Sequence, residues 1–354
     1  MAAKKKEKVS KGVEVSDLSS NTGLSAEVLK QLASYGVVPR IEHDKVPKGH
    51  TGSLRLDWVM GGGIPKKRLT TLTGKRKTGK TTLATIICRE EINRGGMVAY
   101  IDTENKFNAD WAESLGVDLT KFVMLPVKTG EQLINTMKFL LTQDVFDGYV
   151  IDSIRGTTWD AEESADAEQM HMGIAGRMWN RFARICSGPL EKSKAWILAL
   201  NGVYASMEPM SKEMIEPGGT GIPYMAALRL RTQPPIKVEG SDEITFRVKC
   251  LETQVGGRDG REGSITVTYL NENKAIVNPL PDMSSMAKEL GAVKQSGAWF
   301  FVGDNKYQGE LKFQEAMRDD PELYDYVFDA IMEKINGEAP ALPFEDFVED
   351  EYQL

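Results

Sequence analysis

The feature of this sequence that most limits its possible folds is the string GKRKTGKT, which begins at Gly74 and matches the G-x-x-x-x-G-K-[ST] loop completely. Its glycines let backbone N–H groups surround phosphate oxygens, Lys80 reaches the β- and γ-phosphates, and the Thr81 hydroxyl ligates Mg²⁺. The β-branched residues 69–73 are typical of a buried strand, and the apolar residues 82–87 begin a helix whose N-terminus faces the phosphates. This order of strand, loop and helix predicts that the chain binds ATP or GTP. The residues expected to contact the nucleotide here are Gly74, Lys75, Arg76, Lys77, Thr78, Gly79, Lys80, Thr81 and Thr82.

Composition limits the class of protein. The chain has 354 residues, of which 41% are hydrophobic and 27% charged, as in ordinary soluble globular proteins. Its longest apolar runs, such as residues 195–200, are far too short to span a bilayer, and the N-terminus has no apolar signal-peptide core. Cys88, Cys186 and Cys250 form no disulfide or metal-binding spacing. We therefore expect a cytoplasmic protein that makes no contact with a membrane.

Charge is unevenly distributed along the chain. The net charge is −7, which argues against a simple basic protein that coats DNA. The first eleven residues are rich in lysine, whereas six acids and no Lys or Arg lie from Glu338 onward. Each end is consistent with a solvated, disordered tail. The alternative is a basic arm that touches nucleic acid and an acidic tail that competes for basic surfaces.

Strand and helix patterns alternate from residue 51 to about residue 200. Buried strands are predicted at residues 69–73, 98–102, 122–125, 149–152 and 195–200, and a helix at residues 131–142. Such βαβ alternation predicts an α/β fold, in which a mostly parallel sheet carries helices on both faces.

Segments of different pattern flank this region. Residues 26–33 have a helical pattern with Ser25 as N-cap, and a linker with Pro and Gly follows. Apolar and polar residues alternate at 244–250 and again at 265–269, which predicts an antiparallel hairpin. The predicted domains are an N-terminal helix and linker that contact another subunit (1–50), a P-loop core (51–280), a small C-terminal α/β domain (281–337) and an acidic disordered tail (338–354).

Acidic residues follow two of the predicted strands. Asp152 ends the strand in FDGYVIDS, a position from which a carboxylate holds Mg²⁺ through water in a P-loop fold. Glu104 follows the strand in YIDTE, and its carboxylate is predicted to face the γ-phosphate as general base for hydrolysis. Asp102 in the same motif is an alternative orienting group for Glu104 or for the loop. Lys80 and Glu104 are thus the predicted catalytic residues, and Thr81 and Asp152 the predicted metal ligands.

Taken together and in order, these motifs resemble those of RecA-class homologous-recombination proteins, and the chain is similar to a phage-encoded member. TGSLRLD, beginning at Thr51, resembles the family's lead-in to its core, and the nucleotide loop, YIDTE and VIDS follow in the family's order. HMGIAGRM from His171, EPGGTG from Glu216 and GAW from Gly297 also match family segments. The resemblance covers residues 50–335 and implies a RecA-like core, with ATP and Mg²⁺ as cofactors.

The resemblance also implies a binding site for the base of the nucleotide. Trp111 falls where an aromatic ring stacks on adenine, and Asn108 where a polar side chain meets the base edge. Asn201 matches a family residue at the ATP site. The alternative for Trp111 is a helix residue that faces the core.

Two DNA-binding loops are implied, at about residues 165–172 and 202–217. The first is acidic, so a DNA phosphate would bind the N-terminus of the following helix, and arginines on that helix would add charge. Met172 would either wedge between bases or pack in the core. The second loop is apolar and weakly charged, which favours a binding role for an exposed loop. The residues implied in DNA binding are Met172, Gly173, Ile174, Arg177, Arg184, Met207, Lys212, Gly218 and Gly219.

The chain departs from the family pattern at three positions. Where the family has a glutamine that senses the γ-phosphate, this chain has Gly202. Glu252 and Gln254 stand where bacterial members place two lysines that reach ATP on the neighbouring subunit. A carboxylate would repel a γ-phosphate, so Arg258 and Arg261 in the adjacent turn are candidates to substitute.

The function implied by the resemblance is a DNA-dependent ATPase that polymerises on single-stranded DNA and catalyses homologous pairing and strand exchange in recombination and repair. Its partners would be single-stranded DNA, homologous duplex DNA, further copies of the chain in a helical filament, and loader or single-strand-binding proteins. Sequence preference should be weak, because such proteins grip the backbone and leave pairing to the bases. Two alternatives remain open: a RecA-fold hexameric helicase, and an ATP-binding scaffold that coats DNA with negligible hydrolysis.

Overall fold

The computed structural model describes residues 24–35, 46–160, 173–205, 214–237, 239–271 and 274–338. The chain divides into two units, Met1–Lys45 and Val46–Leu354. In the first unit, helix α2 (Ala26–Ser34) follows Ser25, whose hydroxyl accepts a hydrogen bond from the backbone N–H of Val28 at 3.4 Å. This confirms the predicted helix and its N-cap.

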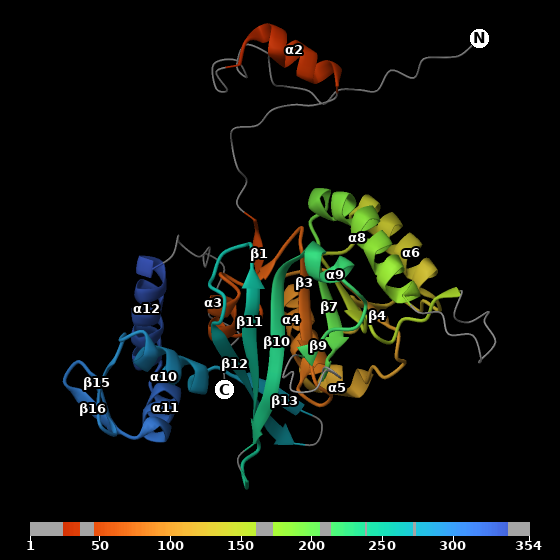
Figure 1. Ribbon diagram of the computed structural model, residues 1–354. Helices are drawn as coiled ribbons and strands as arrows, with labels where there is room; N and C mark the ends of the chain where they lie inside the picture. Colours follow the sequence, from red (N-terminus) through yellow and green to blue (C-terminus); the bar gives the residue numbers. More distant parts are fainter. Residues whose placement is uncertain are drawn as a thin grey trace, which may run out of the picture. The chain divides into compact units, whose positions relative to one another are not determined.

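The second unit is built around a nine-stranded sheet with the order β13-β12-β11-β10-β3-β7-β6-β4-β5 (Figure 1). The strands from β10 to β5 in this order are parallel, and β11, β12 and β13 join them as antiparallel strands. This confirms the predicted α/β fold with its mostly parallel sheet and its hairpin. The strands are β3 (Leu69–Gly74), β4 (Val98–Asp102), β5 (Phe122–Met124), β6 (Gly148–Asp152), β7 (Trp196–Gly202), β10 (Ala226–Lys237), β11 (Glu243–Thr253), β12 (Glu262–Asn271) and β13 (Lys274–Asn278).

Side chains along the central strands alternate between two apolar cores, one on each face of the sheet. In β7, Trp196, Leu198 and Leu200 belong to the core that α4 covers, whereas Ile197 and Ala199 belong to the core that α6 and α8 cover. Burial on both faces explains why residues 195–200 form a continuous apolar run in the sequence. The helices of this region are α4 (Lys80–Asn93), α5 (Ala109–Ser114), α6 (Gly130–Gln143), α8 (Ile174–Lys192) and α9 (Gly221–Met225).

The C-terminal part of the chain has an apolar core of its own. Met286, Phe313 and Val327 pack in it, together with Leu54 from the short helix that precedes the main sheet. The elements outside the main sheet are β1 (Lys48–Gly49), α3 (Leu54–Val59), β2 (Ile64–Pro65), β8 (Tyr204–Ala205), β9 (Met214–Ile215), α10 (Leu280–Glu289), β14 (Lys294–Ser296), β15 (Trp299–Val302), β16 (Asn305–Gln308), α11 (Glu310–Asp319) and α12 (Pro321–Glu338). The predicted division into four domains stays a prediction, and residues 339–354 of the predicted acidic tail lie outside the described residues.

The length and polarity of the helices show whether any of them could span a membrane. Across the part of the chain that the structure describes, every helix is too short or too polar to cross a bilayer.

One buried carboxyl group ties the C-terminal helix α10 to the main sheet. Asp282 accepts hydrogen bonds from the hydroxyls of Ser53 at 3.0 Å and Ser264 at 2.6 Å, and Arg55 attracts its charge. Burial nevertheless dominates and raises the pKa of Asp282 to about 6. The ionised carboxylate is therefore held at a cost in stability at neutral pH.

We expect Asp282→Asn to stabilise the protein at pH 8 by up to about 3 kcal/mol, because the amide keeps an acceptor and removes the buried charge. The folded-state pKa lies above that of the unfolded chain. The stability linked to protonation is therefore fully present below about pH 4 and is lost as pH rises through about 6. Thermal unfolding at pH 4.5 and pH 8 measures the effect. The exposed Asp304→Asn serves as control, and an equal shift in Tm at both pH values for Asp282→Asn would contradict the argument.

Candidate functional site

The predicted nucleotide loop joins β3 to α4 and packs against side chains of β10 and β11. A Cβ on Gly74 would lie 1.9 Å from the Thr232 hydroxyl oxygen, and one on Gly79 would lie 2.1 Å from Cδ1 of Phe246. Gly79 also has a positive φ of 87°. The Thr78 and Thr232 hydroxyls share a hydrogen bond of 2.6 Å. Close packing therefore requires glycine at both positions, and the backbone conformation requires it at Gly79 as well.

Lys80 lies across this loop at the start of α4. Its Nζ donates to the carbonyl oxygens of Lys75 at 2.8 Å and Gly74 at 3.1 Å. Burial lowers the pKa of the Lys80 amino group, and the charges of Asp152 and Glu104 oppose that shift. The three predicted charged residues of the site are thus close enough to interact.

Thr81 and Asp152 meet at the carboxyl end of β6. The Thr81 hydroxyl donates to Oδ2 of Asp152 at 3.0 Å, and the Tyr100 hydroxyl donates to the same oxygen at 2.7 Å. Burial raises the pKa of Asp152, and both hydrogen bonds oppose it. No cluster of three His, Cys, Asp or Glu side chains that fits a metal occurs among the described residues. A hydroxyl and one partly buried carboxylate fit Mg²⁺, which takes its other ligands from phosphates and water.

Glu104 is fixed by hydrogen bonds on both carboxylate oxygens. Oε1 accepts from the Ser153 hydroxyl at 2.7 Å, and Oε2 pairs with Nζ of Lys106 at 2.6 Å. The hydrogen bonds from Lys106 and then Ser153 lower the pKa of Glu104. Ser153 lies in the VIDS motif, so its position was visible in the sequence although its role was not. Asp102 accepts three backbone N–H bonds from residues 104, 106 and 107 and so fixes the segment that carries Glu104, while its role in orienting Glu104 or the nucleotide loop stays a prediction.

Asn108 and Trp111 lie at the start of α5. The Asn108 side-chain oxygen caps the helix by accepting from the backbone N–H of Trp111 at 2.9 Å. The Trp111 ring stacks on Tyr269 of β12 at a centroid distance of 5.6 Å and packs against one apolar core. One ring face is therefore covered by protein, which supports the core-facing alternative for this residue. Its contact with adenine stays a prediction.

Asn201 connects the nucleotide region with the end of the second predicted DNA loop. It pairs in register with Thr73 of β3, and its Nδ2 donates to the carbonyl oxygen of Pro217 at 2.7 Å. Asn201 is only 3% exposed, and its Oδ1 has no hydrogen-bond partner among the described residues. A buried acceptor without a partner is costly and is typical of a functional position.

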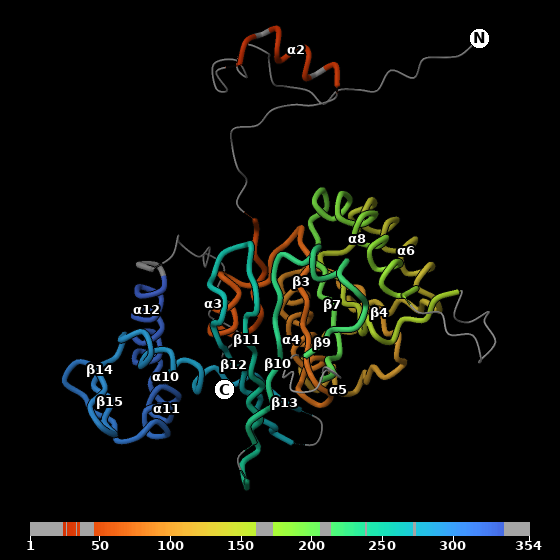
Figure 2. The backbone as a smooth tube through the Cα atoms, viewed as in Figure 1, coloured from red at the N-terminus to blue at the C-terminus, as the bar shows by residue number. Residues whose placement is uncertain are grey.

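Glu216 makes a second connection from the same loop end to β3. Its carboxylate accepts from Arg231 at 2.9 Å, from Arg229 at 3.3 Å and from the Thr73 hydroxyl at 3.3 Å. Arg229 also pairs with Glu252 at 3.0 Å. Strands β3, β7 and β10, which carry or adjoin these groups, are neighbours in the sheet (Figure 2). These pairings were not predicted from the sequence, because most of the partners are far apart along the chain.

Two of the predicted DNA-binding glycines lie against helix α8. A Cβ on Gly219 would come within 2.8 Å of the Gly176 Cα, and one on Gly218 within 2.7 Å of Cγ2 of Ile154. Both have a positive φ, as does Gly173 at the N-cap of α8. The structure therefore brings the end of the second predicted loop together with the N-terminus of α8, through contacts that only glycine allows.

Exposed arginines follow one face of α8. Arg177, Arg181 and Arg184 are spaced four and three residues apart, and all three are exposed. Arg181 was missed in the sequence, although its spacing from its neighbours carried the signal. Ile174, by contrast, is 8% exposed and packs in the core, so only its backbone is available to DNA.

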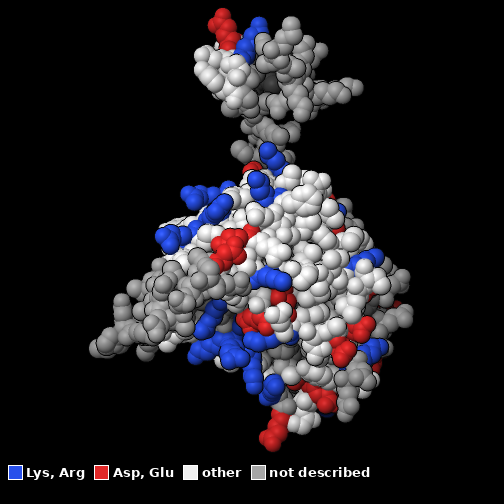
Figure 3. Space-filling model, turned by 90° about the vertical axis from the view of Figure 1, so that its right-hand side faces the viewer, with Lys and Arg blue, Asp and Glu red and all other residues white. Residues whose placement is uncertain are grey.

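The rest of the predicted DNA contacts cannot be placed on the described chain. Met172, Met207 and Lys212 lie outside the described residues, as do all of residues 165–172. On the face that carries α6 and α8, Lys and Arg side chains gather in groups, with acidic side chains between some of them (Figure 3). The basic surface is thus local, in a chain whose net charge is −7.

The two hairpin arginines differ in their surroundings. The Arg261 guanidinium lies 4.1 Å from the centroid of the Trp58 ring and donates to the Trp58 carbonyl oxygen at 3.3 Å. Arg258 is exposed. Of the two candidates to replace the family's lysines, Arg258 is therefore the freer to reach another subunit.

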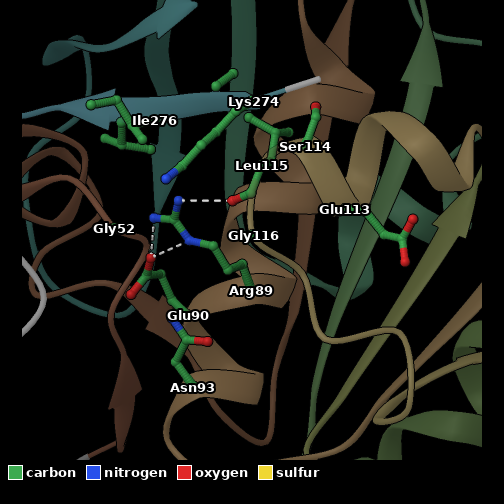
Figure 4. Close-up of a pocket in the computed structure, with 12 residues that line it drawn as sticks. Gly52, Arg89, Glu90, Asn93, Glu113, Ser114, Leu115, Gly116, Lys274 and Ile276 are labelled. Atoms are coloured by element: carbon green, nitrogen blue, oxygen red, sulfur yellow. Dashed lines mark hydrogen bonds and ion pairs between the residues drawn. The ribbon is translucent and has the colours of Figure 1, made fainter. Parts of the chain in front are cut away.

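A separate cavity of about 430 Å³ lies away from the nucleotide loop, between α4, the segment after α5 and β13 (Figure 4). Lys274 points toward the Arg89 guanidinium in it, and Arg89 bonds Glu90 and the Leu115 carbonyl oxygen. Glu90 thus already compensates the charge of Arg89. No predicted site residue lines this cavity.

Comparison with known proteins places these features in a family. The model of the RecA N-terminal domain matches residues 29–266. The protein named RecA of Thermus aquaticus is 29% identical over 307 residues, which cover 84% of this chain and 88% of that protein. The RecA protein of Chlorobium limicola is 27% identical over 344 residues, covering 94% and 97%. A crystal structure of the RadB recombinase covers 64% of this chain and 97% of its own at 20% identity and a TM-score of 0.48. The family match spans most of the chain and includes the nucleotide loop, Glu104 and Asp152, and the chain therefore belongs to the RecA family.

Proposed function

We propose that this protein is a DNA-dependent ATPase that polymerises on single-stranded DNA and catalyses homologous pairing and strand exchange. The observation that carries the proposal is a pair of links to the end of the second predicted DNA loop, one from the strand of the nucleotide loop and one from the neighbouring strand β7. Asn201 bonds Pro217, and Glu216 bonds Thr73. A change at the phosphates therefore has a short physical path to residues expected to touch DNA.

ATP would bind with its phosphates on the backbone N–H groups of the nucleotide loop and at the N-terminus of α4. Lys80 would turn from the loop carbonyls toward the β- and γ-phosphates. Mg²⁺, when bound beside Thr81 and Asp152, would neutralise phosphate charge. Glu104 would orient the attacking water and accept its proton, with Ser153 and Lys106 holding the carboxylate in place.

DNA would bind along α8 and the Gly218–Gly219 turn. The free N–H groups at the start of α8 and the exposed arginines Arg177, Arg181 and Arg184 would contact phosphates and not bases. Binding should therefore weaken as salt rises and vary little with sequence. Residues 1–50 are proposed to contact the next copy in a helical filament. Homologous duplex DNA, loader or single-strand-binding proteins, a phage origin and a cytoplasmic location belong to the same proposal.

ATP turnover with and without single-stranded DNA, measured alongside electron microscopy with a non-hydrolysable ATP analogue, tests this function. Strong stimulation by DNA together with regular filaments is the expected result. Filaments without turnover would replace the proposal with a DNA-coating scaffold. Turnover with closed rings, together with unwinding but no pairing of homologous strands, would replace it with a helicase.

A further inference from the structure

Because Gly202 has no side chain, there is space beside the nucleotide site, and the Arg155 side chain occupies it. Strand β6 ends at Asp152, and the backbone N–H of Ile154 then donates to the Leu200 carbonyl oxygen at 2.9 Å. The chain therefore continues alongside the end of β7. Arg155 lies next to Gly202: a Cβ on this glycine would be 3.6 Å from Cδ and 3.9 Å from Nη1 of Arg155.

The positive charge of Arg155 is not compensated by any described residue at this position. It is exposed, and its guanidinium makes no ion pair or hydrogen bond among the described residues. Three neighbouring cations are engaged, since Lys106 pairs with Glu104, and Arg229 and Arg231 pair with Glu216. Arg76 of the nucleotide loop is a second exposed cation here, and its charge helps to lower the pKa of Glu104. A charged group gains most from an anionic ligand when no protein group already compensates it.

The residues around Arg155 place it at the edge of the predicted catalytic group. A Cβ on the next residue, Gly156, would lie 2.7 Å from Cγ of Glu104. On its other side, Gly202 pairs in register with Gly74 of the nucleotide loop and follows the buried Asn201. Arg155 thus lies between the carboxylate predicted to activate water and the start of the second predicted DNA loop.

We propose that the Arg155 guanidinium binds the γ-phosphate of ATP and, through its contact with Gly202, transmits the presence of that phosphate to the segment that begins at residue 202. This rests on the proposed function, in which the nucleotide lies on the loop at Gly74 and the second loop binds DNA. A planar guanidinium offers several donors to a phosphate, and a glycine at 202 leaves room for it. With this contact, a chain that lacks a side chain at position 202 would still bind ATP and ADP differently.

Binding of nucleotides in the absence of DNA tests the phosphate contact. A fluorescent ADP derivative is displaced by ADP or by a non-hydrolysable ATP analogue from the wild type and from Arg155→Ala, Arg155→Lys and Arg155→Gln. Loss of a charge-assisted bond should weaken binding of the ATP analogue by roughly 10- to 100-fold in Arg155→Ala. Binding of ADP should change by less than about twofold, since ADP has no γ-phosphate, and Arg155→Lys should retain part of the preference for the ATP analogue. The exposed Arg318→Ala on α11 is the matched control.

The double variant Arg155→Ala/Gly202→Gln separates a phosphate contact from a general structural role. Gly202 has no positive φ, and among the described residues the flexible Arg155 side chain is the only neighbour of a Cβ there, so glutamine fits without backbone strain. The added amide should restore part of the preference for the ATP analogue over ADP. An unchanged ratio of the two affinities in Arg155→Ala, or an equal loss of both, overturns the proposal.

DNA-stimulated turnover then tests the transmission step. Arg155→Ala should lose most of the stimulation by single-stranded DNA even at ATP concentrations that saturate the variant, whereas a retained stimulation would overturn the transmission. If the wild type itself shows no stimulation, the proposed function fails, and the affinity ratio measured without DNA still decides the phosphate contact.

Discussion

Replacing Glu104 with Gln is expected to lower ATP turnover by roughly 10²–10⁴-fold while ATP binding is retained. The amide has nearly the shape of the carboxylate and can still accept the bond that Ser153 donates to Oε1 at 2.7 Å. It cannot take a proton from water. The loss should therefore appear in kcat and leave nucleotide affinity and filament formation with the ATP analogue close to those of the wild type.

Steady-state hydrolysis and nucleotide displacement measure these quantities side by side. Glu113→Gln is the matched control, because Glu113 is an exposed glutamate on α5. Turnover that survives Glu104→Gln would assign the base to another group. A wild type that does not hydrolyse ATP at all would favour the scaffold alternative.

Most of the fold could be predicted because the central strands are buried on both faces. The five predicted parallel strands match β3, β4, β5, β6 and β7 to within about two residues, since buried strands form continuous apolar runs. The long strand β10 was not predicted. Its burial changes along its length from both faces to one, and Pro234 and Pro235 interrupt its pattern.

The site could be predicted as far as its residues lie within contiguous motifs. Lys80, Thr81, Glu104 and Asp152 each follow a recognisable strand or loop, and the structure brings them within interaction distance of one another. Contacts between segments that are distant in the sequence correspond to no recognisable sequence motif. Glu216 with Arg231, and Arg155 with Gly202, are joined only by the folded sheet, so no local rule of spacing predicts them.

Whether a given side chain is buried or exposed also could not be predicted from the sequence. Ile174 and Gly173 are adjacent in a segment implied in DNA binding, yet one side chain is buried in the core and the other residue caps a helix. Hydrophobic side chains at a helix start serve packing as readily as binding, and only the position of the helix on the sheet decides between them.

Replacing Lys80 with Ala is expected to weaken ATP binding by roughly 10- to 100-fold and to reduce turnover to background, because its ammonium group is the loop's charged donor to the β- and γ-phosphates. ADP should lose affinity as well, since it retains the β-phosphate. The loss of ADP affinity distinguishes Lys80→Ala from Arg155→Ala, which should weaken binding of the ATP analogue alone. It also distinguishes Lys80→Ala from Glu104→Gln, which should weaken the binding of neither nucleotide. Nucleotide displacement by ADP and by the ATP analogue measures all three patterns, with the exposed Lys138→Ala on α6 as control.

Unchanged ADP affinity in Lys80→Ala would contradict the β-phosphate contact. If Lys80→Ala and Arg155→Ala give the same pattern, the two cations do not divide the phosphates between them, and the γ-phosphate contact of Arg155 loses its support.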